Sequence, residues 1–191
     1  MSEIKIKTGS LQTEKTRRLV LAALMAALTY VGTMIIKIPT STNGYIHPGD
    51  GFVLLSGIML GPVWGSLAAA IGSAMSDLIG GYFIYVPATF LIKGATALVA
   101  SLIFKGLAKV LENKKNVIKL VLAGIIGELV MVTGYFVFEI FILTAGESSG
   151  LAAGVAAAAV GILPNIIQGI FGVVISTTLY PLLSRLYKSA S

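Results

Sequence analysis

Five charged residues fall within or at the edge of long apolar stretches, namely Asp50, Asp77, Lys93, Glu128 and Glu139. Charged side chains in hydrocarbon are costly and usually mark a functional site. Carboxylates and an ammonium group can hydrogen-bond a polar ligand. Asp77 and Lys93 could instead form a buried ion pair that joins two helices, and Glu128 could make a helix-packing hydrogen bond. We assign Asp50, Asp77, Lys93 and Glu139 to a predicted substrate site.

Two carboxamides and a histidine extend this set. Asn165 and Gln168 are three residues apart, so they share one helix face. Their carboxamides donate and accept hydrogen bonds, which suits a ligand with hydroxyls or ring nitrogens. Interhelical amide bonding, worth about 1 kcal/mol, is the alternative. His47, the only histidine, lies in a segment rich in Gly and Pro that could close over a pocket as a lid.

Three tyrosines lie in the same predicted loops as these polar residues, namely Tyr45, Tyr82 and Tyr85. Tyrosine is common at membrane–water interfaces, where it anchors a helix. It can equally stack on the ring of a ligand. We include Tyr85 in the predicted substrate site.

The sequence shows no catalytic motif. It lacks cysteine, which excludes thiol catalysis and cysteine-based metal sites. It also lacks a P-loop and a G-x-S-x-G motif. The net charge of +6 does not indicate a nucleic-acid partner, because the charges fall in short segments between apolar runs. We predict a binding protein rather than an enzyme, with no catalytic residue, no metal and no cofactor held by this chain.

Composition indicates an integral membrane protein. Hydrophobic residues make up 56% of the 191 residues and charged residues only 12%. The mean hydropathy is +0.93. About 20 apolar residues are needed to cross the hydrocarbon as a helix. The apolar runs predict six helices, which cover about 17–36, 51–61, 64–79, 87–111, 117–144 and a last run that ends near 186.

The predicted fold is therefore an all-α bundle of six transmembrane helices. Residues 1–16 form a predicted cytoplasmic N-terminal leader, and residues 17–191 a single six-helix membrane domain. The second helix is too short to cross upright. The Ala- and Gly-rich stretch 151–160 could be a loop, a short helix or the start of the last helix, in which Pro164 predicts a kink.

The basic residues predict the orientation. Twelve of the fourteen lysines and arginines lie before the first helix, around the turn between the fourth and fifth, or after the last. Cytoplasmic loops carry such an excess, so both ends are predicted to be cytoplasmic. In this topology Asp50, Asp77, Lys93 and Glu139 converge on the outer half of the bundle. This placement predicts a pocket open to the outside.

Four alanines form two overlapping A-x-x-x-A patterns near the cytoplasmic end of the first helix, namely Ala22, Ala23, Ala26 and Ala27. Small residues at this spacing let helices approach closely. From spacing alone, packing inside the bundle is favoured.

The chain resembles the substrate-binding S components of energy-coupling factor (ECF) vitamin transporters, in the branch of the riboflavin, pyridoxine and hydroxymethylpyrimidine types. The resemblance rests on residues 47–50 (HPGD), 60–65 (LGPVWG), 71–78 (IGSAMSDL) and 87–94 (PATFLIKG). It implies a multi-pass protein of the bacterial cytoplasmic membrane that binds a vitamin near its outer face. It also implies a transmembrane T component and two cytoplasmic ATPases as partners, and ATP is used by those ATPases. The family's A-x-x-x-A motif contacts the T component, which reverses the preference for internal packing of the alanines.

The acids, the lysine, the histidine and the amides favour a small polar heteroaromatic, such as a pyridoxine-like or hydroxymethylpyrimidine-like vitamin. Riboflavin is the alternative cargo. A membrane-embedded enzyme that acts on a lipid-like substrate would instead use Asp77, Glu128 and Glu139, with a divalent metal, from the cytoplasmic side. A self-assembling channel and a transporter that works alone are further alternatives.

Overall fold

The computed structural model describes residues 2–42, 44–112, 115–146 and 150–189. Its elements in chain order are α1 (Ser2–Met34), β1 (Ile38–Pro39), β2 (Tyr45–Ile46), α2 (Asp50–Leu60), α3 (Pro62–Gly80), α4 (Val86–Val110), α5 (Asn116–Gly146), α6 (Leu151–Ala159) and α7 (Ile162–Ser189).

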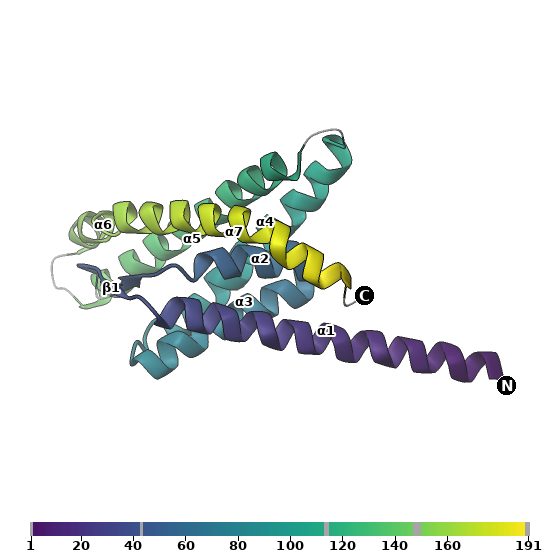
Figure 1. Ribbon diagram of the computed structural model, residues 1–191. Coiled ribbons are helices and arrows are strands. Elements are labelled where there is room, and N and C mark those ends of the chain that lie inside the picture. The colour runs from purple at the N-terminus through teal and green to yellow at the C-terminus, as the bar shows by residue number, and fades with distance from the viewer. Residues whose placement is uncertain (1, 43, 113–114, 147–149, 190–191) are drawn as a thin grey trace.

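The long helices run up and down through one bundle. Both termini lie at one end of the molecule, as do the neighbouring ends of α4 and α5 (Figure 1). The two short strands and α6 lie at the opposite end. The basic residues gather at the end with the termini, so this end is cytoplasmic by the positive-inside rule. The strands therefore mark the outer end.

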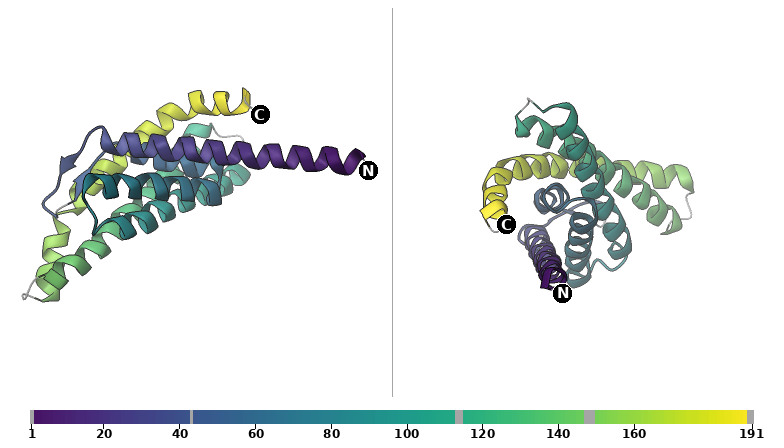
Figure 2. Two further views of the ribbon diagram at one scale, coloured as in Figure 1. Left: turned by 90° about the horizontal axis from the view of Figure 1, so that it is seen from below. Right: turned by 90° about the vertical axis from the view of Figure 1, so that its right-hand side faces the viewer.

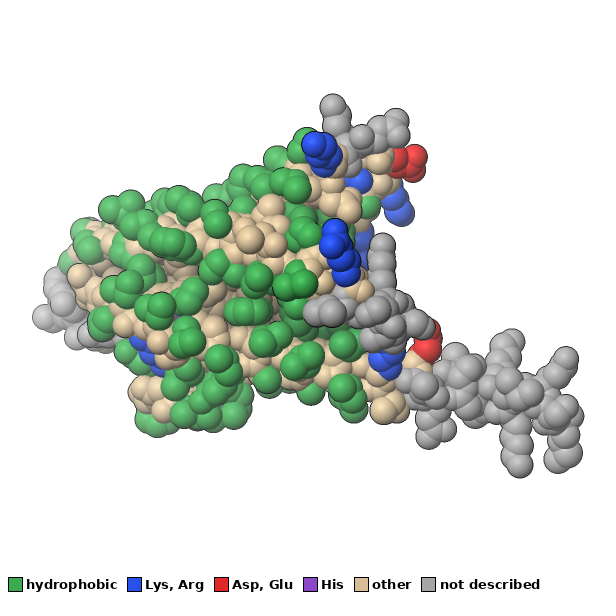
Figure 3. All heavy atoms as spheres, viewed as in Figure 1, with side chains coloured by type: hydrophobic (Ala, Val, Ile, Leu, Met, Phe, Trp, Pro, Cys, Tyr) green, Lys and Arg blue, Asp and Glu red, His purple; other side chains and the backbone are tan. Residues whose placement is uncertain are grey.

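Among the described residues, five segments are long and apolar enough to cross a membrane, which confirms a multi-pass fold. They are Glu14–Met34, Pro62–Gly80, Val86–Val110, Asn116–Ala145 and Leu151–Arg185. In Figure 3, hydrophobic side chains cover the flank of the bundle, and most of the visible charges lie at the cytoplasmic end. Helix α2 has only 11 residues and corresponds to the short second helix that the sequence predicts.

Helix α2 forms the centre of the bundle. It packs against α1, α3, α4 and α7. Its residues Val53, Leu54 and Leu55 are completely buried. A Cβ at Gly57 would collide with the carbonyl of Ala97 in α4, so glycine is needed for the close contact of these two helices.

Two details differ from the sequence-based expectations. Helix α1 is continuous from Ser2, whereas the helix was expected to begin near residue 17, and its N-terminal part extends beyond the bundle (Figure 2). The Ala- and Gly-rich stretch forms the short helix α6, and the chain turns at Val160 and Gly161 before α7 begins. Pro164 thus lies in the first turn of α7, where proline is tolerated, and does not kink a longer helix. The cytoplasmic leader at 1–16 stays a prediction.

Candidate substrate site at the outer end

A short antiparallel hairpin covers the outer end of the bundle. Strands β1 and β2 pair with Ile38 opposite Ile46 and Pro39 opposite Tyr45. The amide of Thr40 donates to the carbonyl of Gly44 at 2.9 Å, which closes the turn. We call residues 38–46 the outer hairpin. Because it follows α1 directly and leads into α2, its position is fixed by two helices of the bundle.

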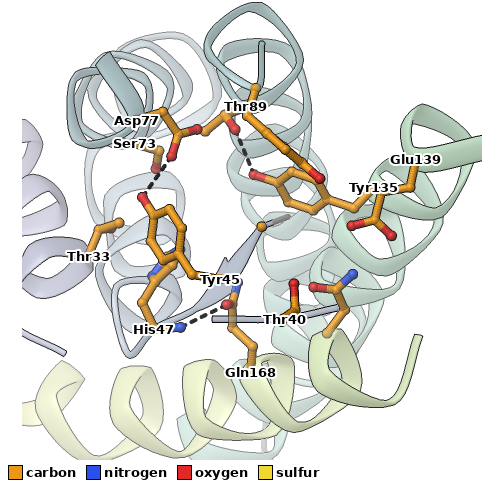
Figure 4. Close-up of a pocket in the computed structure, with 13 residues that line it drawn as sticks. Thr33, Thr40, Tyr45, His47, Ser73, Asp77, Thr89, Tyr135, Glu139 and Gln168 are labelled. Atoms are coloured by element: carbon orange, nitrogen blue, oxygen red, sulfur yellow. Dashed lines mark hydrogen bonds between the residues drawn. The ribbon is translucent and has the colours of Figure 1, made fainter. Parts of the chain in front are cut away.

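A partly enclosed pocket lies beneath the outer hairpin (Figure 4). Its free volume is about 30 Å³. Its lining comes from α1, the hairpin region, α3, α4, α5 and α7, and consists of Thr33, Thr40, Gly44, Tyr45, His47, Ser73, Asp77, Tyr85, Thr89, Tyr135, Glu139, Asn165 and Gln168. Tyrosines, hydroxyls, amides and acids are therefore brought together from segments far apart in the sequence.

The outer hairpin is tethered to the bundle by two carboxylates. The hydroxyl of Tyr45 donates to Asp77 of α3 at 2.7 Å. The hydroxyl of Thr42 donates to Glu139 of α5 at 2.7 Å. The hydroxyl of Tyr85 also donates to the Thr42 carbonyl, at 2.6 Å. We call these contacts the rim of the pocket.

The rim also contains a cation–aromatic contact. The Lys37 ammonium lies 4.3 Å from the ring centroid of Tyr45 and 5.3 Å from that of Tyr82. Burial lowers the pKa of Lys37, while the nearby Asp77 opposes this effect. Burial, followed by the charge of Asp77, raises the pKa of Tyr45. Tyr45 therefore remains a hydrogen-bond donor to Asp77 at physiological pH.

Beneath the pocket lies a buried ion pair. Lys93 Nζ of α4 is 2.5 Å from Asp50 Oδ1 at the start of α2, and both side chains are completely buried. Gln168 Nε2 of α7 donates to the other oxygen of Asp50 at 2.8 Å. We call these three residues the floor. The suggested Asp77–Lys93 ion pair is wrong, because Lys93 bonds Asp50 and Asp77 bonds Tyr45.

His47 connects the floor to the hairpin. Its backbone amide donates to Gln168 Oε1 at 2.9 Å, and its Nδ1 accepts from the Gly49 amide at 3.1 Å. Burial, then the positive charge of Lys93, lowers the pKa of His47 to about 3. The imidazole is therefore neutral at physiological pH. One carboxamide, that of Gln168, joins the hairpin backbone to the ion pair.

Six of the eight predicted site residues line the pocket, and two do not. The six are His47, Asp77, Tyr85, Glu139, Asn165 and Gln168. Asp50 and Lys93 are completely buried in the floor and do not line the pocket. Contact with substrate stays a prediction for all eight. Burial of Tyr85 and the charge of Glu139 raise the pKa of this tyrosine to about 12, so its hydroxyl stays a donor.

Sequence reasoning missed several polar lining residues. Ser73, Thr89 and Tyr135 each precede an assigned charged residue by four positions, Asp77, Lys93 and Glu139 respectively. Residues four apart share a helix face. This spacing was a usable signal for all three.

Two polar atoms of the lining have spare hydrogen-bonding capacity. Ser73 Oγ and Glu139 Oε2 are buried and have no hydrogen-bond partner among the described residues. Buried polar atoms are usually paired. We therefore expect these two atoms to become hydrogen-bond partners of a ligand once the pocket opens.

The two alanine patterns of α1 face different directions. Ala22 is buried and Ala26 half-buried in the contact with the bundle, where a Cβ on Gly72 of α3 would meet the carbonyl of Ala26. Ala23 and Ala27 are exposed. Of the two A-x-x-x-A patterns, the pair Ala22 and Ala26 therefore faces the bundle, and the pair Ala23 and Ala27 faces outward.

The fold and the site together define a helical membrane protein with a polar pocket at its outer end. The chain matches the family described as "ECF-type riboflavin transporter, S component" over residues 13–185. This match covers most of the chain, so the protein belongs to that family, and the sequence-based resemblance to ECF S components is confirmed. The substrate branch within these S components stays a prediction. The family consists of transporter components, not enzymes. Family and fold together make the chain a multi-pass cell-membrane protein.

Two individual proteins are also similar. A solved structure, described as "Structure and mechanism of the S component of a bacterial ECF transporter", superposes with a TM-score of 0.67 at 24% identity. The superposition covers 91% of this chain and 99% of that chain, so it supports the fold. An uncharacterized protein from Pyrococcus woesei is 33% identical over 106 residues, which are 55% of this chain. The match spans just under two thirds of that relative, at 66% of its length.

Proposed function

We propose that this chain is the substrate-capture subunit of an ECF-type importer and that its cargo is riboflavin. The observation that carries the proposal is the pocket beneath the outer hairpin, which gathers six of the eight predicted site residues from separate elements. The family description supports riboflavin as the cargo. The chain delivers the vitamin inward together with a T component and two ATPases. Those ATPases use the ATP, and this chain performs no chemistry of its own.

The composition of the lining favours a neutral ring with several polar atoms. No lysine or arginine lines the pocket among the described residues, because Lys93 is held by Asp50. Tyr45, Tyr85 and Tyr135 offer aromatic faces. Ligand sites of this kind combine aromatic surface with a few placed polar groups. A flavin ring and its hydroxylated chain match that combination.

A pyridoxine-like or hydroxymethylpyrimidine-like vitamin is the second candidate, and the size of the pocket favours it. The free volume of about 30 Å³ is far below the several hundred Å³ typical of ligand sites. The sequence-based preference for these vitamins also used Asp50 and Lys93, which do not line the pocket. Asp50 and Lys93 therefore do not support these vitamins as cargo.

Either ligand requires the outer hairpin to move. Entry would break the contacts of Tyr45 with Asp77, of Thr42 with Glu139 and of the His47 amide with Gln168. Each neutral hydrogen bond contributes about 1 kcal/mol, and bonds to charged groups about 1.5–3 kcal/mol. Opening therefore has a moderate cost. Capture follows when the rim closes again over the vitamin, and tilting of the bundle then presents the site to the inner side.

The exposed Ala23 and Ala27 face of α1 is the surface proposed for the T component. These small side chains leave room for a second helix to approach closely. An exposed groove of about 300 Å³ runs beside it and is lined by Ala27, Tyr30 and Met75 among others. Ala22 packs inside the bundle instead, and Ala26 is half-buried against the bundle at the edge of this groove. Ala27→Leu should therefore weaken copurification with the T component and leave vitamin binding intact.

The test is a titration of the purified protein in detergent with riboflavin, pyridoxine and hydroxymethylpyrimidine. Riboflavin fluorescence should be quenched with a stoichiometry of one to one, without ATP or metal. Tight binding of pyridoxine alone would replace riboflavin with the second candidate. Absence of binding by the folded protein to all three compounds would contradict the proposed function.

A further inference from the structure

Glu128 of α5 is a buried acid that the pocket does not use. Its side chain is 5% exposed, and neither carboxyl oxygen has a hydrogen-bond partner among the described residues. It lies 12 residues after the start of α5 at Asn116, or about 18 Å along the helix, which is near the middle of the hydrocarbon. An unpaired acid at this depth calls for a physical explanation.

Glu128 lies directly beside the floor. The α-carbon of Gly172 in α7 contacts both side chains, since a Cβ there would meet Glu128 Oε1 at 2.8 Å and Asp50 Cβ at 2.9 Å. The charged groups that act on Glu128 are Asp50 of α2 and Lys93 of α4. Gly169 and Gly172 of α7 both lie against the Glu128 side chain. His47 also acts on Asp50, and Tyr135 lies 5.2 Å from Lys93 Nζ.

The charges around Glu128 do not balance if it is ionised. Lys93 supplies one positive charge, and Asp50 already pairs with it at 2.5 Å. A second carboxylate would leave one uncompensated negative charge at mid-membrane depth, which costs several kcal/mol. A protonated Glu128 leaves the group neutral and offers an O–H to Asp50.

On the side away from the floor, Glu128 faces apolar side chains. It lines a groove between α5 and α7 of about 300 Å³, whose remaining lining is apolar and includes Leu129, Ile166 and Val173. These side chains are in contact with the lipid-facing surface, as Leu129 is 59% exposed. Hydrocarbon cannot solvate a carboxylate, so the groove also favours the protonated form of Glu128.

We propose that Glu128 is a positioning residue that stays protonated beside Asp50 and so keeps the floor in the arrangement that holds the outer hairpin closed. The link runs from Asp50 to Gln168 at 2.8 Å and from Gln168 to the His47 amide at 2.9 Å. Ionisation of Glu128 would repel Asp50 and compete for Lys93. Gln168 would then lose its anchor, and the hairpin would open more easily. The link to vitamin release rests on the proposed function, whereas the protonation does not.

Infrared spectroscopy tests the protonation without any ligand. The difference spectrum between the wild type and Glu128→Gln at neutral pH should contain the carbonyl stretch of a protonated carboxyl. The matched control is Glu112→Gln, which changes an exposed acid near the cytoplasmic end and should show only the bands of a carboxylate. A carboxylate signal for Glu128 would overturn the proposal, whether or not riboflavin binds.

The release rate of riboflavin tests the positioning role. Between about pH 6 and about pH 9, release from the wild type should accelerate by roughly tenfold. Glu128→Gln, a neutral isostere, should release slowly at every pH, and Glu128→Ala should release quickly at every pH. A Glu128→Gln profile that follows the wild type, or that matches Glu128→Ala, would contradict the positioning role. Failure of riboflavin to bind the wild type would reject the proposed cargo, and the infrared result would still decide the protonation of Glu128.

Discussion

The rim and the floor of the outer pocket both bury acidic side chains but use them differently. In the floor, each oxygen of Asp50 has a partner, Lys93 on one side and Gln168 on the other. In the rim, Glu139 uses one oxygen for Thr42 and leaves the other without a partner among the described residues. A saturated acid stabilises the fold, whereas an unsaturated acid can bind a ligand. We therefore expect Asp50 to stabilise the fold and Glu139 to contact the ligand.

The largest effect is expected in the floor. Lys93→Met should lower the free energy of unfolding by about 3–5 kcal/mol, because it leaves Asp50 buried without its cation. Denaturant or thermal unfolding in detergent measures the change. The double variant with Asp50→Leu removes both charges and should recover much of the stability. A single variant as stable as the wild type would show that the ion pair does not stabilise the fold.

Neutralising an acid of the rim should produce the opposite pattern. Glu139→Gln keeps an acceptor for Thr42 but removes the charge, so stability should change by less than about 1 kcal/mol. The affinity for riboflavin should fall roughly tenfold or more, because a ligand bond to a charged group is lost. Titration of the variant and the wild type at one pH measures the difference. Unchanged affinity would place the free oxygen of Glu139 outside the ligand contact.

The tether at Tyr45 should affect rates more than equilibria. Tyr45→Phe removes the 2.7 Å hydrogen bond to Asp77 but keeps the ring beneath Lys37. Association and dissociation of riboflavin should both accelerate by a few-fold, because the closed position of the outer hairpin is destabilised by about 1 kcal/mol. Stopped-flow fluorescence resolves both rates. The control is Tyr82→Phe, because no hydrogen bond of the Tyr82 hydroxyl enters the rim contacts. If both variants have equal rates, the Tyr45–Asp77 bond does not hold the hairpin.

The smallest effect is expected from acidification. The pKa of His47 is lowered to about 3 in the folded protein, so below its ordinary value near 6.5 the unfolded chain binds more protons. The stability contribution is complete at neutral pH and declines as the pH falls below about 6.5. Between about pH 7 and about pH 6 the loss should be about 0.7 kcal/mol. His47→Asn should remove this part of the pH dependence, and an unaltered profile would assign it to other groups.

The sequence predicted the membrane bundle well because two physical signals are local. Apolar runs of sufficient length define the spans, and the positions of the lysines and arginines define their direction. The ends of the helices were harder to predict. The break before α7 arises at Val160 and Gly161, although Pro164 is the stronger local signal for a distortion.

The sequence predicted many of the site residues but not which of them bond to one another. Charged residues in apolar runs indicated two of the lining residues, Asp77 and Glu139. The other four predicted lining residues came from the carboxamide pair, the only histidine and a loop tyrosine, namely Asn165, Gln168, His47 and Tyr85. Which acid pairs with Lys93 depends on how α2, α3 and α4 pack, and Asp50 and Asp77 are equivalent candidates from sequence alone. Thr42 and Tyr45 act through the geometry of the outer hairpin, which no periodic pattern reveals. Hence the members of the site were easier to predict than their partners.

The shortness of α2 has a consequence for the distance that the cargo travels. Its 11 residues rise only about 16 Å, roughly half of a hydrocarbon core of about 30 Å. If its Leu60 end lies at the cytoplasmic boundary, its Asp50 end lies near the midplane, and the pocket above it lies within the outer leaflet. On the proposed function, the vitamin would then cross part of the bilayer at the moment of capture, and the energy-consuming step would move it over the shorter remaining distance.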